Sequence, residues 1–244
     1  MLTIILIFVC HWYIALFFQT FFHHRYASHK MFKMKPFTEK AFYMLTFLFQ
    51  GSSFLNPAAY AVMHRNHHTH ADTEKDPHSP QFHTNIFDFN KRTFVEYRKL
   101  VNQFLNNEIT LTDVPRWPSL ERIAESLFTR TLFILIYIGI YVAYAPSPWF
   151  YCLIPLHIFM GPIHGFIVNW YGHSLGYRNF KEMPDNSKNT LPIDLLMMGE
   201  LYQNNHHKAP QKRNFAVRWF ELDTGYLISD ILLKLNLIQL HKAK

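Results

Sequence analysis

Histidine is the residue type that stands out in this sequence, with 16 copies among 244 residues. It is also the side chain that most often binds metal ions in proteins. Eight of the histidines fall in four short groups with regular spacing. The groups are His24–His29 (H-x4-H), His64–His68 (H-x2-H-H), Asn169–His173 (N-x3-H) and Gln203–His207 (Q-x2-H-H). We therefore predict a metal centre assembled from these groups.

The spacing inside each group has a structural meaning, because residues three and four apart share one face of a helix. Two groups meet this condition: His64, His67 and His68 in one, and Gln203, His206 and His207 in the other. Asn169 and His173 are one helical turn apart. His24 and His29 are five apart, which an ideal helix does not align. We expect a bulge or a helix end there, since such irregularities are frequent at functional sites.

The number and type of these side chains indicate which metal they bind. Imidazole suits zinc, copper, iron and nickel, and a single zinc ion takes about four ligands. Eight histidines are too many for one ion, so two are implied. Cys10 and Cys152 lie in apolar runs, where we expect them to be small buried residues, not ligands. A di-iron centre held by neutral imidazoles is electron-poor and suits oxygen activation.

The remaining histidines are interpreted differently. His23 competes with His24 as a ligand, and we favour His24. Three histidines lie within apolar runs, where we expect a structural or tunnel-lining role; they are His11, His157 and His164. Three others follow the second group, where we expect them to stabilise the loop; they are His70, His78 and His83.

The composition indicates that the centre sits beside a membrane. Charged residues are only 17% of the chain, against roughly 25% in an average soluble protein. Three segments are long and apolar enough to cross a bilayer: residues 1–22, 128–145 and 149–171. The first lacks the features of a cleaved signal peptide, so we expect it to be retained. Pro155 and Pro162 predict a kink in the third.

Residues 41–63 form a further uncharged run that we predict does not cross. If it crossed, the first two histidine groups would lie on opposite faces of the membrane and could not share a centre. The segment from His23 to Lys40 has five basic residues and one acidic residue, which places it in the cytoplasm. The net charge of +7 fits this orientation, and no nucleic-acid motif accompanies it.

The fold class that follows is an all-α integral membrane protein, a single domain over residues 1–244. It has about three transmembrane helices, the non-crossing membrane segment, and a cytosolic helical cap of residues 64–125 and 178–244 that holds the di-iron centre. Within the cap, Phe89–Leu105 suits an amphipathic helix on the membrane surface. Tyr226–Leu240 has a second helical pattern.

The sequence resembles the membrane fatty-acid desaturase family, specifically compact bacterial acyl-CoA desaturase-like proteins. The matching stretches are His24–His29, His64–Pro80, Asn169–Phe180 and Gly199–His207. The resemblance implies a helical membrane stem with a cytosolic cap. It also implies that Asn169 contacts one of two irons through water. The implied iron ligands are His24, His29, His64, His67, His68, His173, His206 and His207.

Two features depart from the family pattern. Gln203 stands where the last group usually begins with histidine, and some relatives that desaturate near the carboxyl end carry glutamine there. Gln203 is thus either a weaker ligand or a neighbour of the ligands. Only one span precedes the first group, where the animal acyl-CoA enzymes have two.

The function expected from the resemblance is oxygen-dependent desaturation of a fatty acyl chain, most simply acyl-CoA, in a bacterial inner membrane. Dioxygen and a separate electron donor, a ferredoxin or a cytochrome b5-type protein with its reductase, are the expected partners. Tyr60, Trp170 and Tyr171 are candidates to line the acyl tunnel, and Arg178 and Lys181 to attract an anionic headgroup. The alternatives are a related di-iron hydroxylase and a non-enzymatic protein that handles metal or haem.

Overall fold

The structure is a computed structural model that describes residues 1–76 and 78–241. Within these ranges every regular element is helical, and β-type pairing is limited to three isolated bridges. The prediction of an all-α fold is therefore confirmed.

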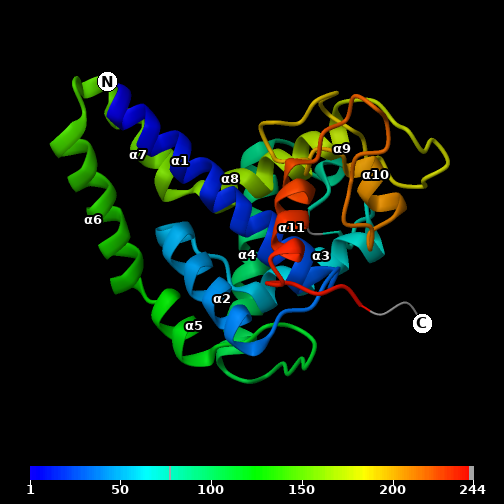
Figure 1. Cartoon of the computed structure of the whole chain (residues 1–244), viewed down its shortest axis with the longest axis horizontal. Coiled ribbons are helices and arrows are strands. Elements are labelled where there is room, and N and C mark those ends of the chain that lie inside the picture. The colour runs from blue at the N-terminus through cyan, green and yellow to red at the C-terminus, as the bar shows by residue number, and fades with distance from the viewer. Residues whose placement is uncertain (77, 242–244) are drawn as a thin grey trace.

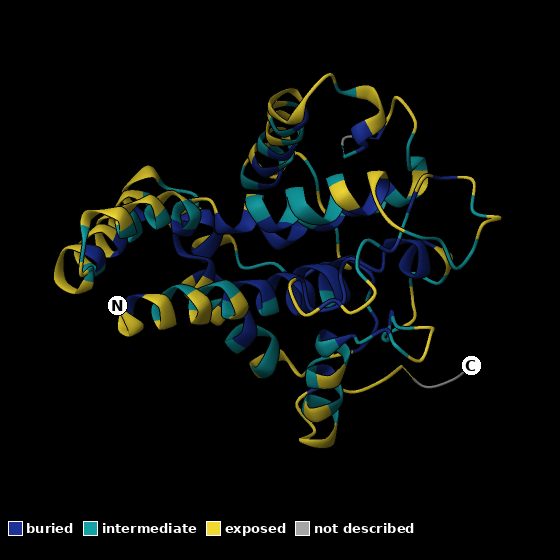
Figure 2. Ribbon diagram, turned by 90° about the horizontal axis from the view of Figure 1, so that it is seen from above, coloured by how far each residue is buried: buried dark blue, intermediate teal, exposed yellow. Residues whose placement is uncertain are grey.

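One part of the molecule is built from apolar helices. The helices α1 (Leu2–Phe18), α6 (Leu127–Tyr144), α7 (Ile154–Ile158) and α8 (Met160–Phe166) contact one another there, and they extend away from the remaining elements in Figure 1. Figure 2 shows that α1 is exposed near the N-terminus and becomes buried toward the centre of the molecule. We call these four helices the stem.

The stem contains two helices that are long and apolar enough to cross a membrane, or three if a bent pair counts as one span. The two are Leu2–Ser28 and Leu127–Tyr144. Large apolar side chains of α6, such as Phe128 and Leu135, are mostly exposed. An apolar surface of this extent is typical of contact with lipid.

The bent pair is Pro148–Ile158 and Met160–Ser174, which meet at 72°. The expected kink is thus present. Pro162 has no N–H to bond to the carbonyl of residue 158, which weakens helical continuity at this point. Gly161 packs closely on the neighbouring chain, where an added Cβ would lie 2.9 Å from the carbonyl oxygen of Ser53.

Residues 41–63 are divided between two helices, α2 (Pro36–Gln50) and α3 (Pro57–His70), with the 3-10 turn η2 (Gly51–Ser53) between them. Gly51 ends α2 in a left-handed conformation with φ of +53°. The side chain of Asn56 then accepts bonds from the first N–H groups of α3. The uncharged run is therefore broken and does not form one continuous helix.

α1 continues directly into a π-helix, η1 (Gln19–Ser28). At its end the N–H of His29 donates to the carbonyl of His24 at 3.1 Å, across five residues. A π-helix brings residues i and i+5 onto one face. This is the irregularity that the H-x4-H spacing predicts.

α4 (Ile86–Leu105) is the predicted amphipathic helix. Tyr97, Val101 and Phe104 are buried in one cluster with Ala58 and Met63 of α3, so the second half of the apolar face is covered by protein. Phe87 and Phe94, in the first half of the same face, are exposed. Contact of that half with a membrane stays a prediction.

The remaining elements are short and surround the histidines. They are η3 (Pro80–Phe82), α5 (Pro118–Ala124), η4 (Pro148–Leu153), η5 (Ile167–Tyr171), α9 (Gly172–Ser174), α10 (Gln203–Lys208) and α11 (Thr224–Lys234).

Two expectations about individual segments are corrected. α11 ends at Lys234, and the residues that follow form a turn and a bend before Gln239, which pairs with Lys33. The helical pattern to Leu240 fails because Asn236 has φ of +58°, which stops a helix. Cys10 in α1 and Cys152 in η4 are free and exposed, not buried.

The turn at Gly51 should be sensitive to a single methyl group. In Gly51→Ala the new Cβ would lie 2.0 Å from the hydroxyl oxygen of Tyr137, at a φ that alanine disfavours. We expect a loss of more than about 1 kcal/mol of stability, measured as a lower thermal midpoint of the purified protein in detergent. Gly139→Ala is the matched control, because no atom lies within 4 Å of its Cβ. Equal midpoints for the two variants would contradict this account.

Candidate metal centre

Five predicted ligands from three separate segments form one cluster. His24 and His29 come from the π-helix region, His64 and His68 from α3, and His206 from α10. Nε2 of His29 lies 2.7 Å from Nε2 of His64, and Nε2 of His24 lies 2.9 Å from Nε2 of His206. One ring nitrogen from each side chain lies within 4.8 Å of all the others. We call this the five-histidine cluster.

His67, His173 and His207 form a second, three-histidine cluster. Nε2 of His67 lies 3.2 Å from Nε2 of His207. The ring of His173 packs on both of the other rings, with centroids 4.8 Å apart in each case. Its Nε2 is buried and has no hydrogen-bond partner among the described residues. A buried ring nitrogen aimed at two other imidazoles suits a cation between them.

The two clusters adjoin because consecutive histidines serve different clusters. In α3, His67 faces the three-histidine cluster and His68 the five-histidine cluster, and His207 and His206 divide in the same way. The rings of His68 and His207 are 4.5 Å apart between centroids. The H-x2-H-H pattern therefore supplies both clusters from one helix.

Carboxylates stand behind four of the eight imidazoles, as hydrogen-bond partners of His67, His173 and His207 and as a close ion-pair contact of His24. The Nδ1 to oxygen distances are 2.5 Å for His24–Glu200, 2.9 Å for His67–Asp76, 2.9 Å for His173–Asp72 and 2.8 Å for His207–Asp185. A carboxylate on Nδ1 fixes the proton there and leaves Nε2 as the electron-pair donor. The four carboxylates also carry four negative charges, which match two divalent cations. The donor set thus fits two metal ions.

Burial favours the neutral form of His64, His206 and His207, which is the form that binds metal. Burial and the neighbouring histidines lower the pKa of His64 and His206 well below the usual value. Burial lowers the pKa of His207 to about 4, although the bond to Asp185 acts against it. Burial raises the pKa of Asp76, but the bond to His67 outweighs it and the pKa falls to about 2.

Glu200 connects the five-histidine cluster to a fully buried arginine. Its second oxygen lies 2.6 Å from Nη1 of Arg25, whose Nη2 lies 2.8 Å from an oxygen of Asp223. The Arg25 guanidinium also stacks 4.1 Å from the ring centroid of Phe215. Removing one partner of such a buried pair costs about 3–5 kcal/mol. The network therefore ties the π-helix to the chain before α10 and to the chain before α11.

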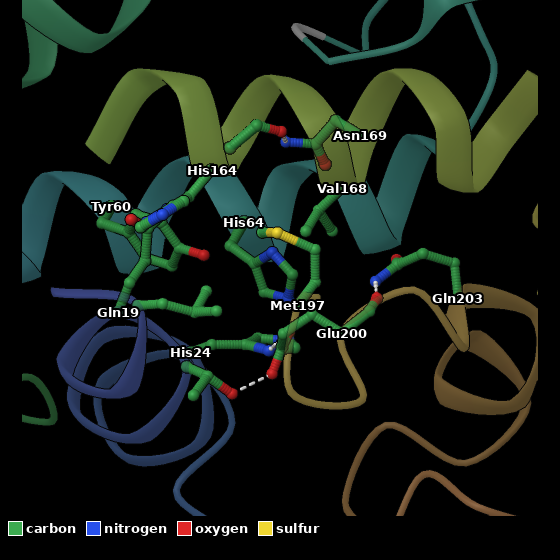
Figure 3. A pocket seen from close by; sticks show the side chains of 13 residues that line it. Gln19, His24, Tyr60, His64, His164, Val168, Asn169, Met197, Glu200 and Gln203 are labelled. Atoms are coloured by element: carbon green, nitrogen blue, oxygen red, sulfur yellow. Dashed lines mark hydrogen bonds and ion pairs between the residues drawn. The ribbon is translucent and has the colours of Figure 1, made fainter. Parts of the chain in front are cut away.

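The two predicted amide groups lie beside the five-histidine cluster (Figure 3). Asn169 in η5 donates to the carbonyl of Gly165 at 2.9 Å, and Gln203 in α10 donates to the carbonyl of Glu200 at 2.6 Å. Both line the same cavity as His24. The contact of either amide with a metal remains a prediction.

The other histidines lie outside both clusters. His23 bonds through Nε2 to the carbonyl of Leu55 at 2.7 Å, so His24 is the clustered member of that pair. His83 pairs with Asp88 at 3.0 Å, and the backbone N–H of His78 donates to Asp76.

The carboxylate partners are the functional residues that sequence analysis missed. Asp76 lies nine residues after its partner His67, which was a usable signal. Asp72, Asp185 and Glu200 gave none, because their histidines lie 101, 22 and 176 residues away. Only folding shows which carboxylate meets which imidazole.

The fold and the site define a helical protein with helices of membrane-spanning length and a buried histidine centre suited to metal. The sequence model of the family described as Fatty acid desaturase matches residues 2–237. The chain belongs to the fatty acid desaturase family, whose members are oxidoreductases of lipid metabolism that generally use iron.

Several relatives are similar along most of this chain. It is 30% identical over 215 residues to Delta-9 desaturase-like 4 protein of Arabidopsis thaliana, covering 86% of this chain and 67% of the relative. It is 25% identical over 220 residues to sn-1 stearoyl-lipid 9-desaturase of Anabaena variabilis, covering 88% and 74%. The match to Palmitoyl-monogalactosyldiacylglycerol delta-7 desaturase, chloroplastic, of Arabidopsis thaliana is 27% over 218 residues, and the chain spans 55% of its length.

The carboxylate behind His207 gives a test of the centre that needs no catalysis. Asp185→Asn keeps the shape but removes the charge, and it weakens the bond to the Nδ1 proton because a neutral amide oxygen replaces a carboxylate. We expect the affinity for ferrous ion to fall by about 10- to 100-fold, measured by equilibrium dialysis with iron analysis. Asp88→Asn is the matched control, because it changes a histidine partner outside both clusters. Equal affinities for the two variants would refute this role of Asp185.

Proposed function

We propose that this protein is an oxygen-dependent fatty acyl desaturase that places a cis double bond in a saturated chain. The supporting observation is the convergence of eight imidazoles from distant segments into two adjoining buried clusters. The proposed ligands of two iron ions are His24, His29, His64, His67, His68, His173, His206 and His207. Asn169 would act through water, and Gln203 would be a ligand or its neighbour.

The proposed reaction balances as follows. A –CH2–CH2– unit, one dioxygen, two electrons and two protons give –CH=CH– and two water molecules. Two bound irons would supply the activation of oxygen. The protein contributes by holding the chain, excluding water and positioning the ligands.

An apolar cavity of about 110 Å³ beside the five-histidine cluster suits a few methylene groups of an acyl chain. It lies between Phe89 and Phe94 of α4 and Pro162 and Phe166 of α8, and it reaches His64. Other residues that line it include Leu55, Tyr60, Met63 and Asn169.

Of the aromatic residues expected in the tunnel, Tyr60 lines this cavity. Trp170 and Tyr171 are not among its lining residues. Their rings pack instead on two residues that line it, with ring centroids 5.4 Å apart for Trp170 and Phe89 and 6.0 Å apart for Tyr171 and Phe166.

The membrane arrangement is also a proposal. The broken segment between α2 and α3 supports three crossings with both histidine clusters on one side. The basic segment His23–Lys40 puts that side in the cytoplasm, in a bacterial inner membrane. Residues 64–125 and 178–244 would form the cytosolic cap of a single domain. Electrons would come from a separate ferredoxin or cytochrome b5-type donor with its reductase.

Product analysis tests the reaction. Expression in a host that makes only saturated lipids should yield new cis-unsaturated chains, two mass units lighter, by gas chromatography and mass spectrometry. His68→Ala should abolish them and lower the iron content, because His68 lies at the boundary of both clusters. His70→Ala, from the same helix but outside the clusters, should retain both.

Other products would identify the alternatives. A chain that gains an oxygen atom would show a di-iron hydroxylase. An unchanged lipid profile from iron-loaded protein supplied with an electron donor would favour a non-enzymatic role in handling metal or haem. Normal activity of His68→Ala would refute the ligand assignment.

We propose that the acyl carrier is coenzyme A. Lys181 is exposed in the chain after His173 and offers a cationic site for the phosphates of this carrier. Two of the relatives named above act, as their names say, on lipid-linked chains. We expect the purified protein with its donor to convert palmitoyl-CoA or stearoyl-CoA in detergent. Conversion only of phospholipid vesicles would overturn the carrier but not the reaction.

A further inference from the structure

A small polar chamber borders the five-histidine cluster on the side of the stem. His24 and His64 form part of its wall, and Gln19, His164 and Asn169 form another part. Figure 3 shows these side chains surrounding one space. Its free volume of about 20 Å³ is enough for one water molecule. We call it the polar chamber.

His164 is the unusual member of this chamber. It comes from α8, in a candidate membrane segment, and its side chain is 0% exposed. Neither of its ring nitrogens has a hydrogen-bond partner among the described residues, and neither does Oε1 of Gln19. A buried polar group without a partner destabilises a fold. Polar side chains inside membrane segments therefore usually mark a functional path.

The other two histidines of the stem, His11 and His157, differ from His164 because both of their ring nitrogens have hydrogen-bond partners. Nε2 of His157 lies 2.8 Å from the hydroxyl of Tyr141, and its Nδ1 lies 2.6 Å from Nδ1 of His11. Nε2 of His11 lies 2.9 Å from the carbonyl oxygen of Phe49. This chain of bonds joins α1, α6, α7 and α2, which is a structural role. His164 has no such role.

The chemistry of the free atoms defines the ligand. Oε1 of Gln19 can only accept a hydrogen bond, while a neutral imidazole offers one donor and one acceptor. A ligand that offers only a carbonyl oxygen could not donate the hydrogen bond that Oε1 of Gln19 lacks. A hydroxylic molecule both donates and accepts, and the volume of the chamber restricts it to the size of water.

We propose that His164 and Gln19 bind a water molecule beside the five-histidine cluster, and that His164 relays protons through it during oxygen reduction. This rests on the proposed function, whose reaction consumes two protons from solvent. The ring nitrogen of His164 that carries no hydrogen takes up a proton from solvent, and the N–H of the other nitrogen gives its proton to the water, which passes one on to the oxygen being reduced. The ring is neutral before and after this exchange, with its N–H on the opposite nitrogen.

Two phenylalanine variants separate this role from a structural one. His164→Phe keeps a ring against Trp12, whose ring centroid is 4.5 Å away, and removes both free nitrogens. His157→Phe is the matched control, because it breaks the hydrogen bonds of His157 with His11 and Tyr141 and leaves His164 unchanged. Iron content, thermal midpoint and kcat with a saturating donor are measured on each full-length protein.

His164→Phe should keep its iron and its midpoint, while kcat falls about 100-fold with an unchanged KM for the acyl substrate. His157→Phe should have a lower midpoint and a kcat within about twofold of the wild type. In His164→Gly, added imidazole should restore turnover. An experimental map should show water density between His164 and Gln19.

A kcat of His164→Phe within about twofold of the wild type would overturn the relay, as would failure of imidazole to restore His164→Gly. An experimental map without water density beside His164 and Gln19 would overturn the water site. These outcomes are distinct from failure of the desaturase proposal. A wild-type enzyme that hydroxylates its substrate would refute desaturation, yet hydroxylation also consumes two protons, so the comparison of variants would still decide the role of His164.

Discussion

The shared carboxylate of Glu200 is the contact on which the rest of the centre depends. One oxygen holds His24 and the other holds Arg25, which is itself held by Asp223. Because all four groups are buried, none can turn to solvent if a partner is lost. The network therefore fixes where the π-helix meets the chain before α10, and with it the distance between His24 and His206.

Helix geometry then explains how so many imidazoles converge without crowding the backbone. The π-helix aligns His24 with His29, while ordinary α-helical spacing in α3 aligns His64 with His68 and leaves His67 to face the neighbouring cluster. Carboxylates behind four of the rings determine which nitrogen points inward. The π-helix packs directly on α3, so a shift of either would move ligands of the five-histidine cluster, and a shift of α3 would also move His67 in the other cluster.

The surroundings of the centre change in character from one side to the other. Toward the chain before α10 lie carboxylates and amides, whereas toward the stem lie apolar residues of α1, α4 and α8. An acyl chain suits the apolar side, since it loses contact with water there. His164 and Gln19 interrupt that apolar side with free polar atoms, which is why the polar chamber carries the proton proposal.

The sequence by itself determined which side chains have ligand spacing, where an irregular helix was needed before His29, and where the third apolar segment had to bend. These features depend on neighbours a few residues away, and short-range geometry expresses them directly. Only the tertiary structure decided that Asp185 and Glu200 stand behind ligands, that α3 covers the second half of the apolar face of α4, and that Cys10 is exposed. It also decided that His157 is fully bonded while His164 is not. Those outcomes depend on contacts between segments far apart in the chain, and an apolar stretch has the same pattern whether protein or lipid covers it.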